Sequence, residues 1–266
     1  MAMARKQPSF TIGADPELFL VSADGKKYIS SIGKIGGSKD CPAPIGGMCA
    51  VQEDNVAVEF NIPPAANFES FKSSIDFSLT TLKQKAEALN LRIAIDASAE
   101  FDPDQLNTPA ARVFGCDPDF NAWTHQQNPR PVASNKSLRS CGGHVHVGTD
   151  ANMIDVIRAM DLFLGCPSTI LDKDTRRREL YGKAGAYRPK GYGGEYRALS
   201  NFWIKSSDLM EWVYNQTKHA IEWVEENTTD GSVEWPRDIA GAIQSCINDN
   251  NKDAYMFLDK KYNFGL

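Results

Sequence analysis

The 266-residue sequence lacks any apolar run of the length that a membrane-spanning helix needs, which is about 20 residues. Its opening segment, MAMARKQPSF, carries charge but has neither an apolar core nor a small-residue cleavage site, so we expect no signal peptide. Both absences predict a cytoplasmic protein without a membrane partner.

Several common kinds of site are also missing. The six cysteines include no Cys-x-x-Cys pair, and their scatter is typical of reduced thiols rather than of a disulfide framework or a zinc knuckle. The formal net charge of -5 argues against general nucleic-acid binding, because duplex binding normally needs a cationic surface. Neither a dinucleotide-binding Gly-x-Gly-x-x-Gly nor a P-loop is present. The absence of a nucleophile elbow or a Cys–His pair argues against covalent catalysis.

What is present is an ordinary globular composition, 42% hydrophobic and 24% charged, without an internal repeat or a long linker. We therefore expect one catalytic domain over residues 1–266. Alternating or apolar runs predict strands at 10–21, 28–32, 51–62, 91–95, 141–148 and 195–204, with functional loops at 33–50 and 100–139. Apolar steps of three and four predict helices at 68–89, 153–164, 207–227 and 237–248. The pattern predicts an α+β fold, a mainly antiparallel sheet with one open polar face and helices packed on the other.

The strands carry an informative polar pattern. Residues two apart on a strand project from the same face, and four predicted strands place acidic or basic groups on one face with apolar groups behind. Such a sheet would form a basin lined by Glu17, Glu59, His144, His146, Glu195 and Arg197. A solvent-facing sheet explains any single strand equally well, and His-x-His can also be a hydrogen-bonded pair. Neither alternative explains clustered Glu and His, so we favour a metal site.

The ligand types indicate which metal. Carboxylates and imidazoles without thiolates suit Mg²⁺ or Mn²⁺ better than a closed, cysteine-rich structural zinc site. The glycines at 142, 143 and 148 would let backbone or ligand approach His144 and His146 closely. The metal-ligating candidates are therefore Glu17, Glu59, His144, His146 and Glu195.

Basic and glycine-rich segments predict phosphate contacts. They are GKIGGSK at 33–39, DKDTRRRE at 172–179 and YRPKGYGGEYR at 187–197. A run of charges is often a solvated face, and that alternative stays open for the second segment. The nucleotide-binding candidates are Lys39, Arg178, Lys190 and Arg197, and the catalytic candidates are Arg188, Arg197 and Glu59.

Metal ligands beside guanidinium groups suit a particular chemistry. A carboxylate is a poor electrophile, and amide formation requires its conversion to an acyl phosphate. Transfer of a phosphoryl group from ATP needs divalent ions and cations to neutralise several negative oxygens. The basin therefore favours a ligase. A metal-dependent hydrolase of amide or phosphoester bonds could use the same His and Glu cluster but leaves the basic segment at 188–197 unexplained. A nucleotide-binding protein without turnover is the third alternative.

Four motifs strengthen the ligase hypothesis: IGADPELFL, DNVAVEFNIPP, SCGGHVHVG and YRPKGYGGEYRALSNFW, spread over residues 11–204. In this order they resemble the phage-type COOH-NH2 ligases (amidoligases, type 2) of the glutamine synthetase and glutamate-cysteine ligase superfamily. The resemblance implies a glutamine synthetase catalytic-domain-like fold, ATP with Mg²⁺ or Mn²⁺, an acyl-phosphate intermediate and ADP as a product. It also implies carboxylate and amine substrates, either small molecules or peptides, and the host cytoplasm if the protein is phage-encoded.

The resemblance also implies individual roles. Glu17 and Glu59 would be metal ligands on adjacent strands, and His146 and Glu195 would complete a second metal position with His144 close by. Arg197 would hold oxygens of ATP or of the acyl phosphate. The segment CDPDFNAW at 116–123 and Lys39 also resemble this group, without a specific role. The two substrates and the oligomeric state stay open.

Overall fold

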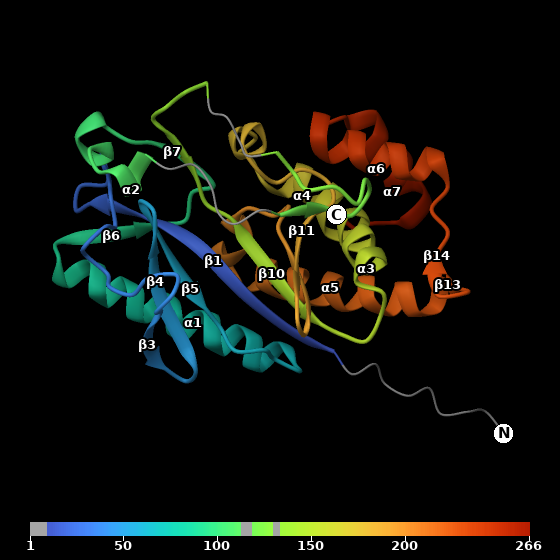
Figure 1. Ribbon diagram of the computed structural model, residues 1–266, viewed down its shortest axis with the longest axis horizontal. Helices are drawn as coiled ribbons and strands as arrows, with labels where there is room; N and C mark the ends of the chain where they lie inside the picture. Colours follow the sequence, from blue (N-terminus) through green and yellow to red (C-terminus); the bar gives the residue numbers. More distant parts are fainter. Residues whose placement is uncertain (1–9, 113–118, 130–133) are drawn as a thin grey trace.

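The computed structural model describes residues 10–112, 119–129 and 134–266 (Figure 1). It contains a ten-stranded sheet in which β2 (Tyr28–Ile29) and β6 (Leu91–Ala94) pair with the second half of its longest strand, β1. The remaining strands lie side by side in the order β3 (Ala43–Gly46), β4 (Cys49–Asp54), β5 (Ala57–Asn61), β1 (Thr11–Ser22), β10 (Gly143–Gly148), β12 (Gly193–Tyr196), β11 (Ala186–Lys190) and β8 (Phe120–Asn121). The strand pairs are antiparallel, so the predicted α+β architecture is confirmed.

The described residues form the helices α1 (Phe68–Ala88), α2 (Pro109–Arg112), α3 (Met153–Met160), α4 (Cys166–Leu171), α5 (Ser207–Asn227), α6 (Arg237–Asp249) and α7 (Lys252–Tyr262). Shorter turns are η1 (Pro103–Leu106), the π-helical η2 (Asp161–Gly165), η3 (Arg176–Glu179) and η4 (Asn201–Lys205). Two small two-stranded sheets pair β7 (Ser98–Glu100) with β9 (Leu138–Ser140), and β13 (Thr228–Thr229) with β14 (Ser232–Val233). Among the described residues, no helix has the length and apolarity needed to traverse a bilayer.

The main core lies between the sheet and the helices α1 and α5, which run along the same side of the sheet (Figure 1). Leu18 and Leu20 of β1 point into this core and are fully buried. On α1, Phe71 and Leu82 belong to the predicted apolar stripe and meet them there. Burial of each such side chain contributes about 1.5–3 kcal/mol, which fixes this face of β1 towards the helices. The opposite face of β1 is left to Asp15 and Glu17.

The sequence predicted a polar face that is open along its whole length, but the structure covers part of it. At one end a second apolar cluster covers it, in which Phe19 packs edge-on against Phe101 with ring centroids 5.4 Å apart. The covering residues come from the irregular segment at 98–141, which includes β7, η1, α2 and β9. The predicted basin is therefore covered at this end, where the apolar cluster lies over the face.

Two predicted strands are wrong in part, one in its middle and the other at its end. Residues 51–62 form a hairpin, β4 and β5, because Asn55 takes the left-handed conformation (φ +60°) that starts a tight turn. The strand expected at 195–204 stops at Tyr196, since the Ser200 hydroxyl accepts a hydrogen bond from the N–H of Phe202 and caps η4. The pattern also missed β11 and the terminal helix α7.

One carboxylate anchors the predicted loop at 33–50, which also contains β3. Glu53 on β4 accepts hydrogen bonds from the backbone N–H groups of four consecutive residues, 33 to 36. Burial raises the pKa of Glu53, but these donors more than offset it, so its pKa lies below the usual value.

Candidate active site

The antiparallel register brings the predicted residues together. Across β1 and β10, Asp15 lies opposite His144, and across β1 and β5, Glu17 lies opposite Glu59. On the other side of β10, Glu195 pairs with both His146 and Arg188. Directly opposed residues have side chains about 4.5–5.5 Å apart at Cβ, so one row of side chains crosses the sheet.

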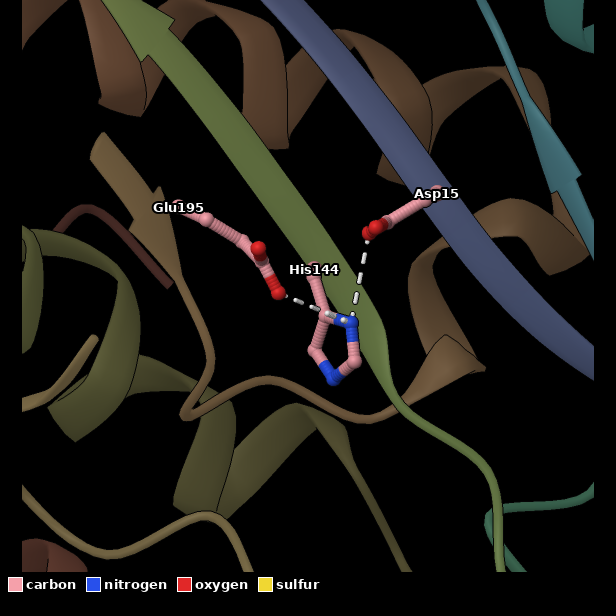
Figure 2. Close-up of side chains that lie close together, drawn as sticks. All are labelled: Asp15, His144 and Glu195. Atoms are coloured by element: carbon pink, nitrogen blue, oxygen red, sulfur yellow. Dashed lines mark ion pairs between the residues drawn. The ribbon is translucent and has the colours of Figure 1, made fainter. Parts of the chain in front are cut away.

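The first cluster comprises Asp15, His144 and Glu195, and Figure 2 shows the two carboxylates converging on the imidazole. His144 Nδ1 is 3.2 Å from Asp15 Oδ1 and 3.6 Å from Glu195 Oε1. All three residues are buried, and their candidate ligand atoms lie within 4.8 Å of one another. Gly142 makes room for the ring, because a Cβ at that position would approach His144 Nε2 to 2.2 Å.

A second cluster of three carboxylates, Glu17, Asp54 and Glu59, lies beside the first. Here too the candidate ligand atoms are within 4.8 Å of one another. Glu17 Oε2 accepts a hydrogen bond of 2.5 Å from the backbone N–H of Gly142, and Glu59 Oε1 accepts one of 3.0 Å from the amide of Gln52. Each of these hydrogen bonds satisfies one oxygen, of Glu17 and of Glu59 respectively. The charges of the three carboxylates still repel one another.

That repulsion is visible in the acid strengths. Burial, together with the charge of Asp54, raises the pKa of Glu17 to about 7. Burial raises the pKa of Glu59 well above its usual value, with further contributions from Asp15 and Glu17. A divalent cation among these oxygens would remove both the repulsion and part of the desolvation cost, so the donor set fits Mg²⁺ or Mn²⁺.

The first cluster is also suited to a metal. Burial and the charge of Arg197 lower the pKa of His144 to about 4, which keeps the imidazole neutral and able to donate a lone pair. Burial opposes ionisation of Asp15, but His146 and His144 more than offset it and hold its pKa well below the usual range. An ionised carboxylate beside a neutral imidazole is a normal metal-ligand pair.

Three cations surround Glu195. Lys190 Nζ lies 2.8 Å and Arg188 Nη1 3.3 Å from Glu195 Oε2, and Arg197 contacts Oε1. Burial and Asp15 raise the pKa of Glu195, but the charges of Arg197 and Arg188 outweigh them, so its pKa falls to about 2. Three positive side chains gathered at one wall of the site suit the binding of an anion such as a phosphate.

Two adjoining pockets open on this face, and Glu17, Asp54, His144 and Arg197 line both. The first is partly apolar, with Phe19, Leu180 and Tyr181 in its wall beside Arg139 and Arg177. The second, of about 320 Å³, is polar and is lined by Lys39, Arg188, Lys190 and both histidines. The shared residues therefore stand between a partly apolar compartment and a second one that is lined by both acidic and basic side chains.

The structure separates the predicted residues into those at the site and one that lies elsewhere. Eight of them line the polar pocket: Glu17, Lys39, Glu59, His144, His146, Arg188, Lys190 and Arg197. Glu195 lies beside that pocket, where it contacts Arg188 and Lys190. Arg178 does not, because its guanidinium donates to the Ser168 hydroxyl (3.0 Å) on the helical side. Its neighbour Arg177 takes the corresponding place at the first pocket. Of the segment at 116–123, residues 116–118 lie outside the described ranges, and Asp119 is 3.4 Å from Arg197 Nε.

Two acidic residues of the clusters had not been singled out as ligands. Asp15 shares a strand face with Glu17, and that spacing was a sufficient signal. Asp54 reaches the second cluster only because β4 ends there in a tight turn, which the pattern did not predict. The structure also distinguishes the histidines, since His144 lies between two carboxylates whereas His146 Nε2 contacts Asp15 Oδ2 alone, at 3.1 Å.

Comparison with known proteins bears on this geometry. Residues 131–230, less than half of the chain, match the family described as "Phage phiEco32-like COOH.NH2 ligase-type 2". The resemblance to the COOH-NH2 ligases is confirmed. The segment that resembles these ligases supplies both histidines, Glu195 and Arg197, whereas the carboxylates of β1, β4 and β5 lie outside it and reach the site through strand pairing. No curated protein matches the chain.

Two solved structures align with most of the chain. One is the GmaS/ADP complex in conformation 1, with 12% identity and a TM-score of 0.38, covering 97% of this chain and 69% of that one. The other is apo GmaS without ligand, with 10% identity and a TM-score of 0.39, covering 98% and 70% respectively. Likeness at this level says nothing about ligands.

The raised pKa values of Glu17 and Glu59 in the second cluster predict a pH-dependent response to magnesium. Glu17 holds its proton more tightly in the folded protein (pKa about 7) than its ordinary value of 4.5, so its contribution to stability is full below about pH 4.5 and is lost as the pH rises through about 7. The apo melting temperature should fall across this window. Added MgCl₂ should raise it more at about pH 8 than at about pH 5.5, because the cation takes the place of the proton. Scanning fluorimetry, with NaCl at matched ionic strength, measures both effects.

Glu17→Gln is the control for this response. It cannot titrate, so we expect both the fall with pH and the magnesium shift to shrink. An equal magnesium shift at the two pH values would contradict the assignment of the cluster as a cation site.

A tyrosine outside the two clusters should tune the metal affinity. Tyr192, half-exposed in the β11–β12 turn, forms a 2.8 Å hydrogen bond with His146 Nδ1, and the two rings stack. Because His146 in turn contacts Asp15, Tyr192→Phe should weaken Mn²⁺ binding by about tenfold, as is usual for partners of metal ligands. Calorimetry or Mn²⁺ EPR measures this affinity, and Tyr255→Phe on α7 is the control. Unchanged Mn²⁺ binding by Tyr192→Phe would show that the hydrogen bond has no such role.

Proposed function

We propose that the chain is an ATP-dependent carboxylate–amine ligase that forms an amide through an acyl phosphate and releases ADP. The observation that carries the proposal is the pair of acidic clusters facing Arg188, Lys190 and Arg197 on one sheet face. The match to a COOH-NH2 ligase family over residues 131–230 supports the same reaction class. In this proposal the whole chain acts as one catalytic domain in the cytoplasm, that of the host if it is phage-encoded.

In this proposal the residues of the site bind two divalent ions and the polyphosphate of ATP. Asp15, His144 and Glu195 would hold one divalent ion, and Glu17, Asp54 and Glu59 the other. Bound Mg²⁺ would neutralise charge on the phosphate oxygens during transfer. Lys39, Arg188 and Lys190 would bind the polyphosphate in the polar pocket, whose volume of about 320 Å³ accommodates it.

The two pockets suit two reactants that meet at a shared wall. A carboxylate substrate in the partly apolar pocket would lie against the wall residues, with ATP phosphates on the other side. Its oxygen attacks the terminal phosphorus, which forms an acyl phosphate and releases ADP. An amine then attacks the acyl carbon, loses a proton and expels phosphate. Arg197 lines both pockets, so its guanidinium could contact the phosphoryl group throughout the transfer.

An oxygen-label experiment tests the reaction. A panel of amino acids, peptides and amines is first screened for ADP release with Mg·ATP. The active pair is then run with ¹⁸O-labelled carboxylate. We expect the label in inorganic phosphate, because one carboxylate oxygen is carried away when the acyl phosphate breaks down.

Other outcomes would identify a different function. Amide formed with unlabelled phosphate, or with AMP and pyrophosphate, would contradict the acyl-phosphate route. Cleavage of amide or phosphoester bonds without ATP would favour a metal-dependent hydrolase. Mg·ATP binding without turnover over the whole panel would favour a nucleotide-binding protein.

A further inference from the structure

The loop at 33–36 forms a cradle of backbone N–H groups around the Glu53 carboxylate. Glu53 Oε2 accepts from the N–H of Gly33 at 2.7 Å, and Oε1 accepts from the N–H groups of residues 34, 35 and 36, each at 2.9 Å. The backbone N–H of Glu53 also donates to the carbonyl of Gly37 at 3.3 Å. Successive N–H groups turned inwards in this way are an anion-binding arrangement, and here the anion is a side chain of the same molecule.

The anchored loop leads directly to a lysine of the polar pocket. Ser38 and Cys41 exchange two backbone hydrogen bonds of 3.0 Å, which close a tight turn with Lys39 at its tip. Lys39 lines the polar pocket, where its positive charge acts on Asp54 of the second cluster. Gly37, between the cradle and this turn, has no room for a side chain, since a Cβ would meet the Val51 carbonyl at 2.3 Å. The path from Glu53 to Lys39 is therefore short, and Gly37 packs closely against β4 along it.

Successive side chains of β4 point to opposite sides of the strand, one towards the site and the other towards the loop. Asp54 and Gln52 point into the site, where they contribute to the carboxylate cluster and its hydrogen bonds. Glu53 lies between them in sequence and faces the loop. The strand that presents a candidate metal ligand also fixes the loop that presents a candidate phosphate ligand.

We propose that Glu53 is a positioning residue, whose carboxylate fills the 33–36 cradle and so holds Lys39 against the phosphates of bound nucleotide. The inference rests on the proposed function, since it requires that the polar pocket bind ATP. It assigns the glycine-rich loop a role unlike that of a phosphate loop. Its backbone N–H groups are engaged by Glu53, so the loop contributes to phosphate binding through Lys39 and not through its main chain.

A double-mutant cycle tests the coupling. Mg·ATP affinity is measured by calorimetry for wild type, Glu53→Gln, Lys39→Ala and the double variant. Lys39→Ala should weaken binding by about tenfold through loss of a charge-assisted contact. Glu53→Gln should weaken it several-fold, because an amide places an N–H₂ group where one set of donors needs an acceptor. The double variant should be no weaker than Lys39→Ala alone, because Glu53 acts through Lys39.

The same loop offers a matched control. Lys34→Ala removes an exposed positive charge five residues earlier, from a side chain that does not line the pocket, and should leave Mg·ATP affinity unchanged. Hydrogen exchange without nucleotide gives a second readout, since the amides of residues 33–36 should exchange faster in Glu53→Gln than in wild type. If Glu53→Gln does not fold, Glu53→Asp, which keeps the charge but is one methylene shorter, should show the same loss of affinity.

The outcomes separate this inference from the proposed function. Wild-type protein that binds no Mg·ATP would overturn both. If wild type binds Mg·ATP and Glu53→Gln binds it with the same affinity, the role of Glu53 is overturned and the ligase proposal stays intact. The same holds if the losses of affinity in the two single variants add in the double variant. Affinity lost equally in Lys34→Ala would also overturn it, since the effect would then be general loop charge.

Discussion

Glu195→Gln is expected to reduce ATP-dependent turnover by about 10³-fold, the largest effect of any single substitution in this site. The carboxylate is fully buried, belongs to the first cluster and contacts Arg188, Lys190 and Arg197. Gln keeps its shape but removes the charge that would hold the cation and balance the three positive groups. The apo melting temperature should also fall, because buried cations left without their counter-charge repel one another.

The measurement is ADP release with Mg·ATP and the active substrate pair, alongside the Mn²⁺ affinity of the free protein. Glu211→Gln, an exposed change on α5, controls for removal of a carboxylate as such. Turnover by Glu195→Gln at the wild-type rate would remove Glu195 from the proposed metal position.

Arg197→Lys should lower kcat by about 10²-fold or more with only a small change in the affinity for ATP. The guanidinium is only 6% exposed, contacts Glu195, and has Asp119 3.4 Å from its Nε, so its plane is fixed by partners on two sides. Lysine keeps the positive charge but has one nitrogen, and it cannot bridge these partners and a phosphoryl oxygen together. The charge dominates ground-state binding, whereas the planar geometry matters for the transferring group.

Steady-state kinetics and calorimetry separate the two quantities. Arg92→Lys on β6, whose side chain is exposed and lies outside both pockets, is the matched control. A kcat within about twofold of wild type would mean that Arg197 contributes charge alone and makes no oriented contact with the reacting group.

Strand alternation alone was sufficient to predict most of the site. Glu17 and Glu59 were expected on one face because Leu18 and Val58, their neighbours, had to be buried, and the cross-strand register then brings the two carboxylates together. Side chains of a strand alternate between its two faces, so once the apolar ones are packed against helices, the residues between them must lie on the other face. The same reasoning placed His144 and Glu195 correctly without any knowledge of how β10 and β12 pair.

In turns and irregular segments, the alternation of apolar and polar residues could not predict where a side chain points. Asp54 reaches its cluster through a turn at Asn55, and a turn has no periodicity to extrapolate. In the 3₁₀ turn η3, consecutive arginines point in different directions, so Arg177 lines a pocket while Arg178 contacts Ser168. Composition could identify the basic run but not which of its members faces the site.

The order of the sheet has a consequence for how the protein matures. The first cluster joins Asp15 on β1 to Glu195 on β12, with β10 between them, although 180 residues of chain separate the two acids. Such long-range pairing forms slowly and late in folding. During synthesis, β5 can pair with β1 early, whereas Asp15 lacks the other two members of its cluster until β10 and β12 have been made. Divalent-ion binding would then report that the central sheet is complete, and a ligand of this site would act as a selective stabiliser of the fully assembled fold.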